Sequence, residues 1–220
     1  MIKGAIFDLD GTLIQTLPSL IWTGNAMLEH YGLAPRSDSD FRHFVGYGAY
    51  ELVRRLLKSH GIDDEAKTRA AYAVYLELFE EGCIKNIAVY PGINEVLDEL
   101  DRQGLPYSVL TNKPHQMTHK VIAHCFDPNR FRILQGQSDA WPRKPDPTAA
   151  LHLAEQMGVE PAACAFVGDS DADMQTAVNG GMIGIGAVWG FRDAAELKQN
   201  GATHLCATPR EFAELLAAQR

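Results

Sequence analysis

The chain has 220 residues, of which 46% are hydrophobic and 22% charged, proportions typical of a soluble globular protein. Lys and Arg together number 20 and Asp and Glu 28, so the formal net charge is −8. No basic stretch interleaved with aromatic residues appears, which argues against a nucleic-acid partner. The four cysteines are scattered without a Cys-x-x-Cys pair, so neither zinc nor a redox dithiol is indicated. No segment approaches the ~18 consecutive apolar residues of a membrane span, and no apolar leader precedes the first strand. We therefore expect a cytoplasmic protein without a membrane partner, either a monomer or a homodimer.

The first predicted element is a buried strand, Ala5-Ile6-Phe7, and helices follow it. Apolar residues at helical spacing predict helices over residues 18–31, 50–60 and 65–81. We therefore expect an all-helical unit over residues 15–85, inserted into a second unit that residues 1–14 and 86–220 form.

From residue 91 onward, strands and helices alternate. The predicted helices cover residues 91–100, the stretch after Pro114, and residues 148–157 and 209–218. The predicted strands cover residues 107–110, 131–134, 164–167, 183–188 and 204–205. This alternation is typical of an α/β fold with a doubly wound parallel sheet.

Acidic side chains lie where strands of this sheet are predicted to end. Asp8 and Asp10 follow the first strand, and Asp169 follows the strand over residues 164–167. Ligands of open α/β sheets bind at this carboxyl edge, and carboxylates so close together repel each other unless a cation or a shared proton intervenes. Each acid alone has a structural explanation as a turn former or a helix cap. As a set in strand order, they indicate a Mg²⁺ site, because oxygen ligands suit this ion.

The residue types predict phosphoryl transfer through an aspartyl-phosphate. Asp8 is the predicted nucleophile, and Mg²⁺ held by Asp8, the backbone carbonyl of Asp10 and Asp169 would make its attack feasible. Asp10 would protonate the leaving oxygen and later take a proton from water, so we do not expect its side chain to ligate the metal. Asp173, one helical turn after Asp169, is expected to orient metal-bound water or Lys144.

Neutral donors and one cation are expected to hold the phosphate. Gly11 permits a tight turn, and the backbone N–H groups around it, with Thr12, can meet an anion. Thr111 and Asn112 would donate to the phosphoryl oxygens, and Lys144 would supply a positive charge for the transition state. Thr111 is also an ordinary residue at a strand end, and a single lysine is most often a solvated surface residue.

These segments resemble the haloacid dehalogenase superfamily of aspartyl-phosphate hydrolases over essentially the whole chain. The matching stretches are Asp8-Leu9-Asp10-Gly11-Thr12-Leu13, Leu110-Thr111-Asn112-Lys113, Lys144-Pro145 and Gly168-Asp169-Ser170-Asp171-Ala172-Asp173. The resemblance implies a Rossmann-like core and makes the helical insertion a cap domain. Within the superfamily, two stretches are most similar to phosphoglycolate phosphatases, namely Phe44-Val45-Gly46-Tyr47-Gly48-Ala49 and Thr111-Asn112-Lys113-Pro114. The implied reaction is the Mg²⁺-dependent hydrolysis of a small phosphorylated metabolite, 2-phosphoglycolate, to glycolate.

The cap is expected to select this substrate by closing over the site. Phosphoglycolate carries a carboxylate that needs a donor, and the core offers no obvious one because Lys144 and Thr111 are committed to the phosphoryl group. The predicted substrate-binding residues of the cap are Arg42, His43, Gly46 and Gly48, and for His43 a surface role is equally open.

Other functions remain compatible with these motifs. A pyrophosphatase and a sugar-phosphate mutase would use the same scaffold. A dehalogenase is disfavoured, because Asp10 supplies an acid that carbon–halogen displacement does not need. A non-catalytic phospho-acceptor signalling domain would also use clustered acids, Thr and Lys, but the helical insertion argues against it, since a receiver needs no cap.

Overall fold

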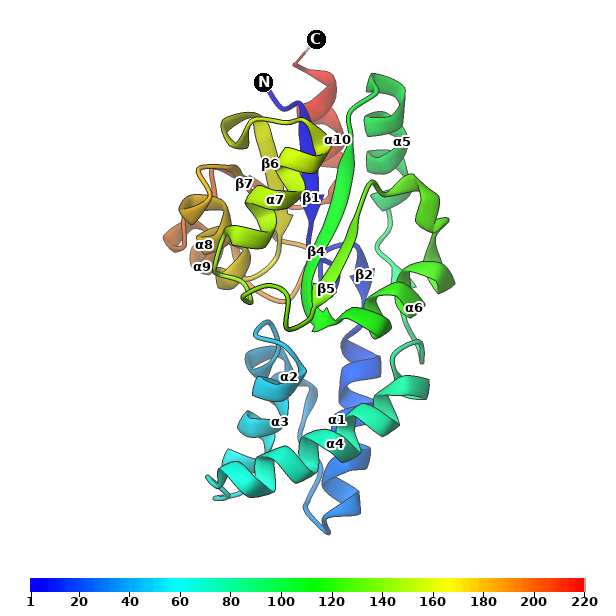
Figure 1. Cartoon of the computed structure of the whole chain (residues 1–220), viewed down its shortest axis with the longest axis vertical. Helices are drawn as coiled ribbons and strands as arrows, with labels where there is room; N and C mark the ends of the chain where they lie inside the picture. Colours follow the sequence, from blue (N-terminus) through cyan, green and yellow to red (C-terminus); the bar gives the residue numbers. More distant parts are fainter. Residues whose placement is uncertain (220) are drawn as a thin grey trace.

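The computed structural model describes residues 1–219 and places a parallel sheet at one end of the molecule and a group of helices at the other (Figure 1). Arg220, the last residue of the predicted core, lies outside the described residues. The strands are β1 (Gly4–Phe7), β2 (Ile14–Gln15), β3 (Ala88–Val89), β4 (Tyr107–Pro114), β5 (Leu134–Gln137), β6 (Cys164–Gly168), β7 (Ile183–Ala187) and β8 (His204–Cys206). The α-helices are α1 (Leu17–His30), α2 (Asp38–Phe44), α3 (Ala49–Lys58), α4 (Glu65–Gly82), α5 (Ile93–Gln103), α6 (His115–Cys125), α7 (Thr148–Met157), α8 (Asp171–Asn179), α9 (Ala194–Gln199) and α10 (Pro209–Ala217). Two short 3-10 helices cover Pro128–Arg130 and Pro161–Ala163.

Six strands form one sheet in the order β5-β4-β1-β6-β7-β8, and all neighbours in it are parallel. The predicted α/β fold with a doubly wound parallel sheet is therefore confirmed. β4 comes next in the chain among the strands of this sheet and pairs with one edge of β1. β6 comes later in the chain and pairs with the other edge of β1. The strand order thus reverses at β1, which is where such sheets open a ligand-binding crevice beyond the carboxyl ends of their strands.

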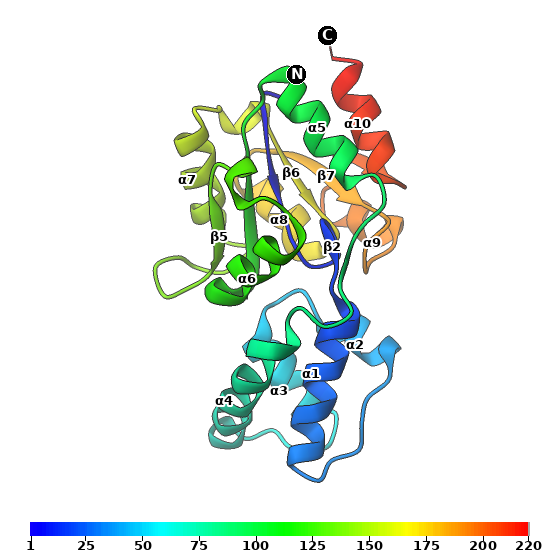
Figure 2. The same cartoon turned by 90° about the vertical axis from the view of Figure 1, so that its right-hand side faces the viewer.

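Helices cover both faces of this sheet because successive strand residues point to opposite sides. In β1, Ala5 and Phe7 belong to a core shared with α5, α6 and α10, and the ring of Phe7 packs edge-on against Phe212 of α10. Ile6 belongs to a second core, which α7 and α8 complete. Accordingly, α5 and α10 lie on the other side of the sheet from α7 (Figure 2).

Helices α1 to α4 form a separate group beyond the carboxyl ends of the strands (Figures 1 and 2). These helices bury the rings of Phe41, Tyr75 and Phe79 completely, in a hydrophobic core that continues to the sheet. Strands β2 and β3 pair antiparallel, so the two passages of the chain between sheet and helices run side by side. The predicted boundaries of the two units, after residues 14 and 85, stay a prediction.

One predicted strand is wrong in its position. We expected it over residues 131–134, but β5 begins only at Leu134. Phe131 is buried because its ring packs against Tyr107 and Phe126, with centroids 5.4 and 5.7 Å away, and not because it belongs to the sheet. Helices α2 and α9 and the pair β2–β3 were not expected either. Within residues 1–219, no helix combines the length and the apolar character that crossing a membrane requires.

Candidate active site

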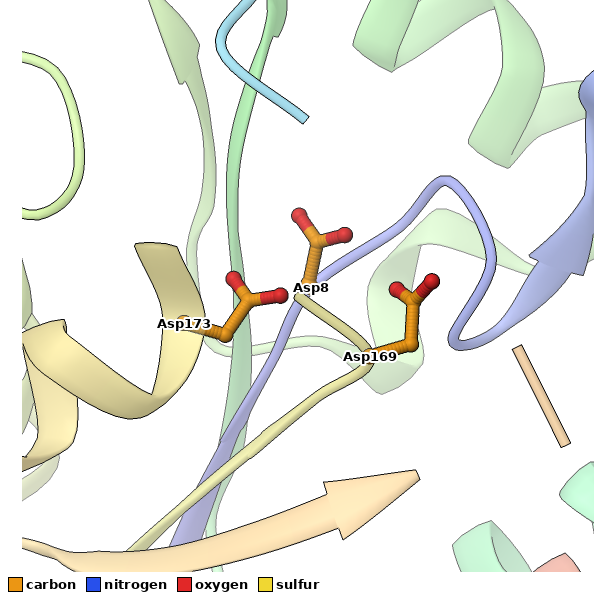
Figure 3. Close-up of side chains that lie close together, drawn as sticks. All are labelled: Asp8, Asp169 and Asp173. Carbon is orange, nitrogen blue, oxygen red and sulfur yellow. The ribbon is translucent and has the colours of Figure 1, made fainter. Parts of the chain in front are cut away.

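Three buried carboxylates converge at the carboxyl edge of the sheet (Figure 3). Asp8 follows β1, Asp169 follows β6, and Asp173 lies in the first turn of α8. Because β1 and β6 are paired up to Phe7 and Val167, the two acids that follow them are neighbours. One oxygen from each carboxylate lies within 4.8 Å of the others, a spacing that suits a metal ion.

Asp173 points back toward the sheet because it closes the start of α8. Its backbone N–H donates to Ser170 Oγ, and its Oδ2 accepts hydrogen bonds from the N–H of Ser170 at 2.9 Å and from Ser170 Oγ at 2.6 Å. Such a capping box fixes the first turn of a helix. The predicted placement of Asp173 on the same side as Asp169 follows from this motif.

Lys144 joins two of the carboxylates. Its Nζ lies 2.6 Å from Asp8 Oδ1 and 2.6 Å from Asp173 Oδ1, and the whole residue is buried. The loop that carries it is held by Asn112, whose Oδ1 accepts from the N–H of Lys144 and whose amide donates to its carbonyl. The structure therefore brings the predicted cation to the predicted nucleophile.

Burial dominates the electrostatics of the cluster. It raises the pKa of the Asp8 carboxyl to about 7, against the opposing attraction of Lys144. Burial, together with the charges of Asp8 and Asp173, raises the pKa of Asp169 well above its usual value. Desolvation would lower the pKa of Lys144, but the charges of Asp173 and Asp8 raise it, so the ammonium stays charged. One ammonium among three carboxylates leaves excess negative charge, which a proton or a cation can neutralise.

Asp10 stands apart from this cluster. Its side chain pairs with Lys113, whose Nζ lies 3.0 Å from Oδ1 and 3.3 Å from Oδ2. The Lys113 ammonium also lies over the ring of Phe79 in α4, 4.6 Å from its centroid. Asp10 therefore faces the cavity between sheet and cap with its carboxylate away from the other three acids.

Two predicted phosphate-binding side chains have other partners. The hydroxyl of Thr12 is fully buried and donates to Asp169 Oδ1 at 2.9 Å. The amide of Asn112 donates to the carbonyls of Gly46 and Lys144, which engages both of its hydrogens. Each side chain holds a neighbouring segment here, and the predicted contacts of both with phosphate stay predictions.

Gly11 and Thr111 also lie at the site, Gly11 through its backbone and Thr111 through its side chain. Gly11 has φ +88°, and a Cβ there would come within 2.3 Å of Asp169 Oδ2, so only glycine fits. Thr111 is buried and lines the cavity, where its Oγ1 accepts from the N–H of Lys113 at 3.3 Å. A hydroxyl that accepts still has a hydrogen to donate to a ligand.

The cap contributes its glycine turn but not its predicted cations. Gly46 and Gly48 line the cavity. Arg42 and His43 are exposed, and neither lines it; Arg42 borders a different groove, and His43 Nδ1 is bonded to the carbonyl of Ser39. The structure does not bring these two side chains to the cavity, and their predicted contact with the substrate stays a prediction.

Sequence reasoning missed the segment that follows β7. The N–H of Phe191 donates to Asp169 Oδ2 at 2.8 Å, and Trp189 Nε1 donates to the carbonyl of Thr12 at 2.9 Å. A Cβ on Gly190 would lie 2.3 Å from Asp169 Cβ. The sequence does contain a signal for the close approach of this segment to Asp169, because Gly190 lies between two aromatic residues shortly after a strand.

Core and cap together line a partly open cavity of about 50 Å³. Its walls include Asp8, Asp10, Thr111 and Asp169 from the core side and Gly46 and Gly48 from the cap. Asp171, for which no part in the site was predicted, joins the two units here, because its carboxylate accepts a hydrogen bond from the hydroxyl of Tyr47. The arrangement can present a buried carboxylate nucleophile to a small ligand shielded from water.

Comparison with known proteins agrees with this site. A family model described as haloacid dehalogenase-like hydrolase matches residues 5–187. A phosphoglycolate phosphatase of Pseudomonas putida is 36% identical over 190 residues, which cover 84% of this chain and 69% of the relative. One of Rhodobacter capsulatus is 36% identical over 183 residues, which cover 83% of this chain and 82% of the relative. The crystal structure of a predicted phosphoglycolate phosphatase from Haemophilus somnus matches with a TM-score of 0.89 at 25% identity, covering 100% of this chain and 98% of that one. The resemblance and the hydrolase predicted from the motifs are thus confirmed, and this chain belongs to the haloacid dehalogenase-like hydrolases.

Proposed function

We propose that this chain is a Mg²⁺-dependent phosphatase that hydrolyses 2-phosphoglycolate to glycolate and orthophosphate through an aspartyl-phosphate on Asp8. The observation that carries the proposal is the buried Asp8 carboxylate, held by Lys144 beside Asp169 on the wall of a small cavity. The names of the relatives support the choice of substrate. The hydrolase family favours this function over a non-catalytic signalling domain.

The donor set fits a hard divalent cation. Asp8, Asp169 and Asp173 carry three negative charges when ionised and Lys144 one positive charge, which leaves a net charge of −2. Asp173 has one oxygen engaged by Lys144 and the other by Ser170. The side chains of Asp8 and Asp169 and the backbone carbonyl of Asp10 would therefore hold the ion. When bound, Mg²⁺ offsets the repulsion between the Asp8 carboxylate and the anionic phosphate.

In the first step, a carboxylate oxygen of Asp8 forms a bond to phosphorus while the bond from phosphorus to the glycolate oxygen breaks. Asp10 gives its proton to that leaving oxygen, and its side chain is 18% exposed toward the cavity, within reach of a bound ester. The carboxylate left behind is stabilised by Lys113 at 3.0 Å. This carboxylate is the base of the second step.

In the second step, water attacks phosphorus, Asp10 takes its proton, and the bond between phosphorus and Asp8 breaks to release orthophosphate. Lys144 and the hydroxyl of Thr111 stabilise the charge on the phosphoryl oxygens in both steps. Because Lys144 is fixed by Asp173 before substrate arrives, it needs no reorganisation during the reaction. The cap keeps bulk water from the acyl-phosphate.

Phosphate release from a panel of phosphate compounds tests the proposal. The panel includes 2-phosphoglycolate, ethyl phosphate, a sugar phosphate and inorganic pyrophosphate, each with Mg²⁺ and with a chelator. We expect the highest kcat/KM for 2-phosphoglycolate, loss of activity with chelator, and a decrease of about 10⁴-fold or more in a folded Asp8→Asn variant. A preference for pyrophosphate, or transfer of the phosphoryl group to a sugar without release, would support the pyrophosphatase or the mutase instead.

A further inference from the structure

Arg192 is a cation at the cavity wall for which the sequence offered no role. It follows β7 in the loop that begins at Trp189, and its side chain is only 11% exposed. It lines the cavity together with Phe191, Ser170 and Gly46. A charged side chain that is largely covered needs partners, and their arrangement shows what the residue can still bind.

Cap carbonyls orient the guanidinium of Arg192. Nη2 donates to the carbonyl of Val45 at 2.9 Å, and Nη1 donates to the carbonyl of Arg42. Both acceptors lie at the C-terminal end of α2, Arg42 in its last turn and Val45 as its C-cap, where carbonyls lack partners within the helix. Nε forms an ion pair with Glu196 at 3.1 Å. Since arginine has five N–H groups, each terminal nitrogen keeps one N–H for a ligand.

The two lysines of the site are paired with its carboxylates. Lys144 lies between Asp8 and Asp173, and Lys113 is paired with Asp10. Within residues 1–219, the cations that line the cavity are Lys113 and Arg192. Arg192 is therefore the cation that can receive a second anionic group of the substrate.

We propose that Arg192 binds the carboxylate of the substrate and determines the preference for carboxylated phosphomonoesters. This inference rests on the proposed hydrolysis of 2-phosphoglycolate. A guanidinium matches a carboxylate better than an ammonium does, because it donates two parallel hydrogen bonds. Since the carbonyls of α2 aim the guanidinium, the carboxylate site is complete only when the cap lies against the core. Binding of the substrate carboxylate, predicted for Arg42 and His43 of the cap, is thus assigned to Arg192 of the core, which the cap positions.

The test compares two substrates that differ in the carboxylate. Arg192→Met and Arg192→Lys are assayed with 2-phosphoglycolate and with ethyl phosphate. Arg143→Met is the matched control, because Arg143 also donates to a cap carbonyl, that of Tyr47, but is exposed and does not line the cavity. Binding of 2-phosphoglycolate is also measured by calorimetry in an Asp8→Asn background, with and without Arg192→Met, which gives a readout independent of turnover.

We expect Arg192→Met to lower kcat/KM for 2-phosphoglycolate by about 10- to 100-fold, mainly through KM, and to lower it far less for ethyl phosphate. The calorimetric Kd should rise by a similar factor, and Arg143→Met should keep the preference of the wild type. Should Arg192→Met fail to fold, Arg192→Lys carries the test, with a smaller loss of the same selectivity.

Equal losses on both substrates, or an unchanged preference in the Arg192 variants, would overturn the inference and leave the proposed function standing. Arg192 would then serve only to hold the cap. A wild-type enzyme that does not prefer 2-phosphoglycolate to ethyl phosphate would overturn both the proposed substrate and the inference.

Discussion

Lys144 connects Asp8 with Asp173, and this contact decides between two roles for Asp173. Asp173 lies 2.6 Å from Lys144 and takes the hydrogen bonds of Ser170 with its other oxygen. The sequence left open whether Asp173 orients Lys144 or metal-bound water. The contacts favour Lys144, whereas Asp169 is held from the far side by Thr12 and Phe191.

This difference predicts separate effects of two matched substitutions on the Mg²⁺ requirement. Asp169→Asn removes a charge from the proposed metal site, so the Mg²⁺ concentration for half-maximal activity should rise by about 10- to 100-fold. Asp173→Asn weakens the hold on Lys144, so kcat should fall with a smaller change in the Mg²⁺ requirement. Phosphate release titrated with Mg²⁺ measures both. Identical Mg²⁺ curves for the two variants would contradict the assignment.

For single residues, the sequence predicts where a side chain lies in the fold better than which groups it contacts. Asp8 and Asp169 could be placed together because each follows an apolar strand, and parallel strands end at one edge. Thr12 and Asn112 could not be assigned, because their partners come from segments 157 and 32 residues away or from the cap. Arg192 escaped prediction for the same reason, since its partners are carbonyls of α2.

Among the elements, the loop between α2 and α3 makes a close contact with the core. Gly48 has φ +87°, and a Cβ there would lie 2.8 Å from the carbonyl oxygen of Asn112. Asn112 in turn donates to the carbonyl of Gly46. The glycines of this loop therefore let the cap backbone approach the end of β4.

Gly48→Ala should accordingly impair activity through the cap. The added methyl group must push the loop away from Asn112, so we expect kcat/KM for 2-phosphoglycolate to fall by about 10-fold or more. Gly61→Ala is the control, because Gly61 also has a positive φ, +76°, but open space around its Cβ position. Both variants should lose about 1–2 kcal/mol of stability from backbone strain. Equal activities of the two variants would show that cap contact at Gly48 does not matter for turnover.

Strands with a clear apolar pattern could be predicted from the sequence, whereas strands without one could not. The run before Asp8 and the run over residues 164–167 form central strands, as expected. The edge strand β5 has the sequence Leu-Gln-Gly-Gln, which no alternation of apolar residues marks, so the buried Phe131 nearby was mistaken for part of it. Strands β2 and β3 have two residues each, too few for any period to appear.

For the molecule as a whole, the buried carboxylate cluster predicts how the free energy of unfolding of the metal-free protein depends on pH. The pKa of Asp8 is about 7 in the folded protein, against 3.8 for an unperturbed aspartate, so between these pH values the folded state holds a proton that the unfolded state has lost. Stability should therefore fall as pH rises from about 4 to 7. Asp8→Asn should flatten this decline, and Mg²⁺ should offset it near neutral pH by binding the folded state.

Thermal unfolding of the metal-free protein at several pH values measures this effect. Asp169 contributes in the same direction, because its pKa is also raised, so the decline should be reduced in Asp8→Asn but not abolished. Identical pH profiles for the wild type and Asp8→Asn would contradict the raised pKa of Asp8.

Detection of a phosphoryl group on Asp8 during turnover directly tests the proposed aspartyl-phosphate intermediate. Wild-type enzyme is mixed rapidly with 2-phosphoglycolate and Mg²⁺, quenched in acid during turnover, digested and analysed by mass spectrometry. We expect one phosphoryl group on the peptide that contains Asp8, removed by hydroxylamine as acyl phosphates are and absent from Asp8→Asn. Release of orthophosphate with no phosphoryl group on that peptide, or with one on another residue, would contradict the account.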